Sequence, residues 1–192
     1  MKTIRMLTSA ALASLVSFTL SAASLTVAPG ETATAASGAY DGMTIQGTLI
    51  VPADGAVTSV TSRVTIDGGT IQLNAGSVLR VKGIDVGASD STITFNGGRL
   101  AIVEEIMATD AGNLTLHGSD GNVIIDHVPT QWKRIFEYAA NTTGRTYVTG
   151  NKDFVVNVSR NTNLSKRENN GVSSLVLRPW RSRRRRTRRW SS

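Results

Sequence analysis

The chain has 192 residues, enough for one domain, and it contains no cysteine, which excludes a disulfide framework and a thiolate metal site. Its formal net charge of +7 is unevenly distributed. Eight arginines and no acid lie in residues 178–192, whereas residues 24–177 carry eleven basic and fourteen acidic side chains. The body of the chain is therefore mildly acidic, and binding driven by positive charge is expected only of the terminal residues.

Residues 1–23 have the layout of a secretory signal peptide. Lys2 and Arg5 precede an apolar run at residues 6–20, and the small residues Ser21 and Ala23 suit the positions before a cleavage site. The run is diluted by Ser and Thr and is short for a bilayer span of about 20 residues. We predict cleavage after Ala23, a secreted or cell-surface location, and no transmembrane segment once the signal is removed.

Residues 24–41 are rich in small side chains and Thr, and they predict an extended capping segment. Such a segment would cover the first edge of the structure that follows, because an open sheet edge invites pairing with another chain.

Residues 42–127 repeat a short pattern four times, in which apolar alternation meets a glycine turn. The repeats are Thr44-Ile45-Gln46-Gly47, Thr65-Ile66-Asp67-Gly68-Gly69, Thr94-Phe95-Asn96-Gly97-Gly98 and Thr115-Leu116-His117-Gly118. Their apolar anchors are 21, 29 and 21 residues apart. A period in the twenties is typical of a solenoid, whose coils bury their apolar faces only by stacking. The longer gap predicts a loop insertion at residues 82–90.

The β-runs of this region are expected at residues 43–51, 62–73, 77–81, 91–103 and 113–126. Glycine between them permits positive φ, and a preceding Asp or Asn can bind the turn backbone. The same Asp-Gly and Asn-Gly pairs build hairpins, so an antiparallel β-sandwich is the alternative fold. The regular spacing favours the solenoid, and we predict an all-β chain with a parallel β-helix of about four coils.

Residues 128–177 are expected to form an irregular C-terminal cap. Trp132, Ile135, Phe136 and Ala139 have helical spacing, which predicts a short amphipathic helix at residues 131–140 that plugs the last coil. Further strands are expected at residues 146–149, 153–158 and 173–177.

The four repeats resemble the coils of right-handed parallel β-helices of the pectin-lyase-like type in bacterial secreted surface proteins, especially autotransporter-adhesin passengers. The resemblance covers roughly residues 40–127 and implies a right-handed, extracellular, rod-like binding or spacer module. Passengers of that family are longer and precede a membrane β-barrel. The resemblance therefore implies a short relative or a truncated passenger.

The carboxylates predict no catalytic pair. The residues that follow the four anchors are Gln46, Asp67, Asn96 and His117, which form no acid column. Asp67 and Asp120 adjoin glycine and are interpreted as turn caps. Glu104 and Glu105 are adjacent and would face opposite sides of a strand. His117 and His127 are predicted to have surface or turn roles, so we predict no catalytic residue, no metal and no cofactor.

The arginine-rich residues 178–192 are expected to be disordered, because like charges repel and little surface can be buried. One interpretation is binding of nucleic acid or anionic lipid by guanidinium groups. The residues concerned are Arg181, Arg183, Arg184, Arg185, Arg186, Arg188 and Arg189. The other interpretation, which we favour, is a frameshift product.

The sequence therefore predicts a non-catalytic structural or adhesive module whose outward Thr, Ser and Asn bind glycans or proteins. The alternatives are a carbohydrate-active enzyme of polysaccharide-lyase type and a binder of anionic surfaces through the cationic tail. Three or more converging charged side chains on one face would favour the enzyme, and a smooth Thr/Ser face would favour adhesion.

Overall fold

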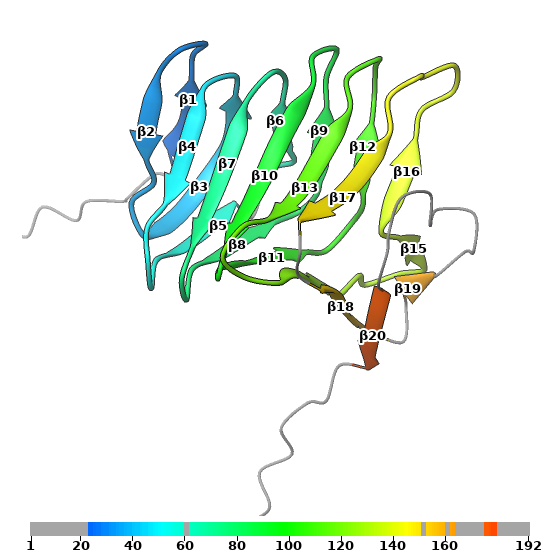
Figure 1. Cartoon of the computed structure of the whole chain (residues 1–192). Coiled ribbons are helices and arrows are strands. Elements are labelled where there is room, and N and C mark those ends of the chain that lie inside the picture. The colour runs from blue at the N-terminus through cyan, green and yellow to red at the C-terminus, as the bar shows by residue number, and fades with distance from the viewer. Residues whose placement is uncertain (1–22, 60–61, 151–152, 160–161, 164–174, 180–192) are drawn as a thin grey trace, which may run out of the picture.

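The computed structural model describes residues 23–59, 62–150, 153–159, 162–163 and 175–179. Every regular element in these residues is a β-strand, and every pairing between named strands is parallel. The described part of the chain accordingly contains no helix that could cross a membrane. The strands stack into a solenoid whose axis runs from left to right in Figure 1.

Each coil contributes three strands, and stacking the coils creates three faces. Face 1 contains β1 (Ala23–Val27), β3 (Gly38–Ile45), β6 (Val64–Ile66), β9 (Ile84–Val86), β12 (Ile106–Ala108) and β16 (Phe136–Tyr138). Face 2 contains β2 (Thr32–Thr34), β4 (Thr48–Val51), β7 (Thr70–Asn74), β10 (Ser91–Asn96), β13 (Leu114–Gly118) and β17 (Thr146–Gly150). Face 3 contains β5 (Ala56–Ser59), β8 (Val78–Val81), β11 (Arg99–Ile102), β14 (Val123–His127), β18 (Phe154–Val158) and β20 (Leu175–Pro179).

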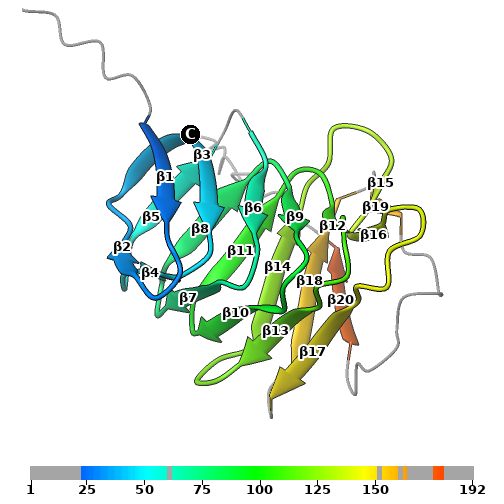
Figure 2. The same cartoon turned by 90° about the horizontal axis from the view of Figure 1, so that it is seen from above.

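Faces 1 and 3 belong to one twelve-stranded sheet because the long β3 pairs with β5 near its start and with β6 near its end. Outside the three faces, β15 (Lys133–Arg134) pairs with β19 (Thr162–Asn163). Figure 2 shows the stack from above.

The parallel β-helix prediction is confirmed, and the antiparallel sandwich is wrong. Six strands stack along face 2, so the solenoid has about five coils, more than the four predicted. The difference arises at both ends. The expected capping segment contributes β1 and β2, and the expected irregular cap contributes β16, β17 and β18.

The core consists of inward-facing columns in which each residue stacks on its counterpart one coil away. On face 2, Leu49, Ile71, Ile93 and Leu116 form one such column, and all four are fully buried. Complete burial of an aliphatic side chain contributes about 1.5–3 kcal/mol. Successive side chains of a strand point to opposite faces of the sheet, so the residues between these buried positions point outward.

The register differs from the predicted one at the 29-residue gap. Ile45 and Ile66 pair on face 1, whereas Phe95 and Leu116 lie on face 2, where Leu116 pairs with Ile93. The gap is therefore a change of face, and the predicted insertion at residues 82–90 is wrong because this segment contains β9. The real expansion lies later, since Ile106 pairs with Phe136 across a much longer connection.

Glycine pairs at the corners have two separate tasks. Gly68 has a φ of 78°, in the left-handed region that glycine adopts readily. Gly69 packs against the coil before it, and a Cβ there would lie 2.5 Å from the Ile45 carbonyl oxygen. The corner after face 1 therefore needs glycine for conformation and for close stacking.

The predicted helix at residues 131–140 is wrong. This segment contains β15 and β16, and β16 pairs with β12. Ile135 and Phe136 are both buried, while Trp132 is 72% exposed. An open β12 edge would leave its backbone groups unpaired, and strand pairing satisfies them where a helix would not. The Phe136 ring packs at 6.4 Å from that of Phe154 and fills the last coil.

Two predicted segments lie outside the described residues: the signal peptide, except for Ala23, and the arginines from Arg181 onward that were assigned to anion binding.

Candidate binding faces

Face 2 presents an ordered column of threonines to solvent. Thr32, Thr48, Thr70, Thr92 and Thr115 pair successively, and Tyr147 continues the column on β17. The threonines of β4, β7, β10 and β13 are half-exposed, and Tyr147 is 43% exposed. Adjacent strands lie about 4.8 Å apart, so the hydroxyl groups repeat at that interval along the axis. We call this set the threonine column.

A second outward column lies two residues further along each strand, about 6.6 Å from the first. We call it the mixed column, and it consists of Thr34, Ile50, Gln72, Thr94, His117 and Thr149. Its side chains contact one another at the C-terminal end, where His117 Nδ1 lies 3.0 Å from Thr149 Oγ1. Next to this column, Asn96 Nδ2 donates to Asn74 Oδ1 at 3.2 Å.

The outer side of face 2 carries no charged residue in either column. It forms the front sheet of Figure 1, and no described segment crosses it. The strands that carry it are held on the other side by the fully buried aliphatic columns. The result is a stiff, neutral, open array of hydroxyl, amide and imidazole groups with one aliphatic side chain, Ile50.

The corner between faces 3 and 1 has the opposite character. Arg63 Nε donates to Asp85 at 2.8 Å, and its Nη1 donates to Glu104 at 2.8 Å and to Glu105 at 2.9 Å. Nη2 donates to the carbonyl oxygens of Ile84 and Glu105, each at 3.1 Å. One guanidinium group thus links three successive coils.

Two lysines complete this cluster. Lys133 Nζ lies 3.1 Å from Glu105 Oε2, and Lys82 Nζ lies 3.6 Å from Glu104 Oε1. We call the cluster of Arg63, Lys82, Asp85, Glu104, Glu105 and Lys133 the acid–base corner.

Electrostatics tie the cations of this corner to their acids. Burial lowers the pKa of Arg63, but the hydrogen bonds and charges of Asp85, Glu104 and Glu105 outweigh it and raise the pKa above its ordinary value. The hydrogen bond and charge of Glu105 raise the pKa of Lys133. Both cations therefore remain charged throughout the ordinary pH range.

The prediction that Glu104 and Glu105 face opposite sides of a strand is wrong. They lie in the bend between β11 and β12, and both reach the same nitrogen of Arg63. Three acids and three bases do converge here, which is the pattern expected of the enzyme alternative. All three acids are paired with cations, however, and Glu105 is buried, so this cluster joins neighbouring coils to one another.

His127 is fully buried, contrary to the predicted surface or turn role. Its Nε2 donates to the Glu104 carbonyl oxygen at 2.6 Å, its Nδ1 lies 3.0 Å from Thr162 Oγ1, and the Thr162 hydroxyl donates to the His127 carbonyl oxygen at 3.3 Å. Burial lowers the pKa of His127, which a bond to the Glu104 carbonyl and the charge of Glu105 only partly offset. Through its Nε2 bond to Glu104, this histidine joins β14 to the acid–base corner.

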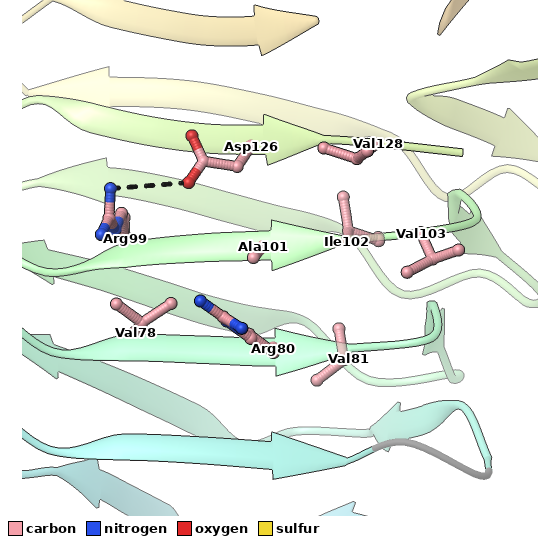
Figure 3. Close-up of a pocket in the computed structure, with 9 residues that line it drawn as sticks. All are labelled: Val78, Arg80, Val81, Arg99, Ala101, Ile102, Val103, Asp126 and Val128. Atoms are coloured by element: carbon pink, nitrogen blue, oxygen red, sulfur yellow. Dashed lines mark ion pairs between the residues drawn. The ribbon is translucent and has the colours of Figure 1, made fainter. Parts of the chain in front are cut away.

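The outer side of face 3 contains a groove of about 290 Å³. It forms where the short Ala101 stands in an outward column between Arg80 and Asp126 (Figure 3). Arg99 Nη1 lies 3.7 Å from Asp126 Oδ2, and Asn157 Nδ2 donates to Asp126 Oδ1 at 2.6 Å. The remaining wall is aliphatic and consists of Val78, Val81, Ile102, Val103 and Val128.

Asp67 is predicted to cap its own turn, but its hydrogen bond joins two coils, since its Oδ1 accepts from the Ser89 backbone N–H of the next coil at 2.8 Å. Asp90 Oδ1 joins the next coil in the same way, accepting from Asn113 N–H at 2.8 Å. Within the described residues, no group of three His, Cys, Asp or Glu side chains is arranged to hold a metal ion.

Comparisons of the chain with protein-family models, with curated proteins and with solved structures found no match.

Proposed function

We propose that this protein is an extracellular structural and adhesive module, non-catalytic, that binds neutral polyhydroxylated surfaces through face 2. The observation that carries the proposal is the threonine column, a continuous row of outward hydroxyl groups on an uncharged face. The signal-like N-terminus and the resemblance to adhesin passengers support an extracellular site of action.

The mechanism follows from rigidity and repetition. A hydroxyl hydrogen bond that replaces one to water contributes only about 0.5–1.5 kcal/mol. A rigid face loses little conformational entropy on binding. Several weak hydrogen bonds that form together can therefore add up to a measurable affinity. Because the face is neutral, salt should weaken this adhesion little.

Binding of the full chain to soluble neutral and acidic polysaccharides at low and high salt tests this function. We expect binding to neutral polymers that varies little with salt and falls at least tenfold in Thr92→Lys, which places a long charged side chain in the middle of face 2. Thr65→Lys is the matched control, because Thr65 points outward on face 1. Binding that is equal in both variants, or that occurs only with acidic polymers and disappears in salt, would contradict the proposal.

The second candidate is a carbohydrate-active enzyme of polysaccharide-lyase type, which the groove on face 3 favours. Arg80 and Arg99 are both exposed, and Arg99 makes one long ion pair, so both guanidinium groups can meet an anionic sugar. Release of unsaturated uronate products from acidic polysaccharides, lost in Arg80→Ala, would establish this activity in place of simple adhesion. The third candidate, anion binding by the arginines of residues 181–189, remains a prediction.

A further inference from the structure

The side chains of the two outward columns of face 2 are regularly spaced in two directions. This spacing restricts the kind of ligand more than the chemical types of the side chains do. Along the axis the side chains repeat at about 4.8 Å, and across each strand at about 6.6 Å. The register is unbroken from β2 to β17, with each pair of neighbouring strands aligned residue for residue. A flexible ligand would contact only a few side chains of this array at once, whereas the surface of a periodic solid can contact all of them.

We propose that the ligand of face 2 is the ordered surface of a crystalline, neutral, β-linked polysaccharide, and that the protein distinguishes this surface from the same polymer in disordered form. The inference rests on the proposed function and specifies its substrate class. The absence of charge in both columns matches a polymer that carries hydroxyl groups and no acid.

The side chains of face 2 favour a sugar surface over the other periodic solid with hydroxyl chemistry, which is ice. Tyr147 continues the threonine column with an exposed ring, and aromatic rings pack on the apolar faces of sugars. Gln72 and His117 interrupt the mixed column with groups that both donate and accept hydrogen bonds. The mixed column is not a uniform row of hydroxyl groups, because Ile50, Gln72 and His117 stand among its threonines.

The chain supplies a matched pair of variants for the test. Thr70→Val/Thr92→Val removes two neighbouring hydroxyl groups from the threonine column and preserves side-chain shape. Thr44→Val/Thr65→Val makes the same change in two neighbouring outward positions of face 1, which also pair directly. Circular dichroism and thermal unfolding of both variants show whether each is folded.

Depletion of the full chain from solution by microcrystalline cellulose, and by the same cellulose swollen to its amorphous form, measures the effect of order. Per unit of accessible surface we expect at least tenfold tighter binding to the crystalline form. We expect this preference to be lost in T70V/T92V and retained in T44V/T65V.

The other outcomes distinguish failure of the crystalline ligand from failure of the proposed function. Equal binding to both forms, or an unchanged preference in T70V/T92V, overturns the crystalline ligand and leaves neutral-surface adhesion standing. Binding to neither form, together with no binding to soluble neutral polymers, overturns both proposals. Inhibition of ice recrystallisation without binding to cellulose would overturn the polysaccharide in favour of ice.

Discussion

Face 2 and the acid–base corner belong to the same coils but differ in charge and in how extensively their side chains bind one another. On face 2 the outward side chains are neutral, half-exposed and linked to one another by few contacts, such as the bond between Asn96 and Asn74. At the corner a single guanidinium binds three acids and two carbonyl oxygens from other coils. The comparison separates a surface available for ligands from one that joins the coils.

The largest expected effect follows from removing the guanidinium of the corner. In Arg63→Ala the buried Glu105 keeps only one cation, Lys133. Two backbone carbonyl oxygens also lose their hydrogen-bond donor. Breaking a buried ion pair from one side costs about 3–5 kcal/mol, and the partial exposure of Arg63 favours the lower figure. We expect a loss of about 3 kcal/mol in the free energy of unfolding, measured by urea denaturation.

Gly83 provides the internal control for that loss. A Cβ at Gly83 would lie 2.3 Å from Arg63 Nη1, so Gly83→Ala should displace the guanidinium and cost about 2 kcal/mol. In the Arg63→Ala background the same change should cost almost nothing, because the obstructed group is gone. Additive effects of the two substitutions would show that the corner does not act as a unit.

A smaller effect, which depends on pH, is expected at His127. Its pKa is lowered in the folded state, so its contribution to stability is complete above the ordinary histidine pKa of about 6.5 and is lost as pH falls through the folded value. His127→Gln keeps a donor for the Glu104 carbonyl and does not titrate. The wild type should lose stability relative to this variant as the pH falls from about 7 to about 5. A stability difference that is constant with pH would contradict the assignment.

The solenoid and its aliphatic interior were predictable from the sequence because coils of similar length repeat the same alternation. The register was not. The repeats that begin at Thr44 and Thr65 lie on face 1, whereas those at Thr94 and Thr115 lie on face 2. In the middle coils every face has a period near 22 residues, so self-similarity identifies the period without identifying the face.

The acid–base corner was missed for a related reason. Arg63 and Glu105 are 42 residues apart, and only stacking over two coils brings them together. Opposite charges separated by one or two coil lengths are the signal that could have revealed the corner, as Arg63 and Asp85 are 22 residues apart. The prediction of a helix at residues 131–140 was wrong because a short apolar run is compatible with both a helix and a stacked strand.

The smallest expected effect concerns face 2 and determines how freely its function can change. Thr70→Val/Thr92→Val should alter the free energy of unfolding by less than about 0.5 kcal/mol, because both hydroxyl groups face solvent and Val suits a strand as well as Thr does. Thermal unfolding beside Arg63→Ala measures the contrast directly. A loss comparable to that of Arg63→Ala would mean that the threonine column holds the coils together, and the reason for treating face 2 as a binding surface would disappear. A negligible change would mean that the threonine column is not needed to hold the coils together, since the buried columns beneath it keep the strands in register unaided.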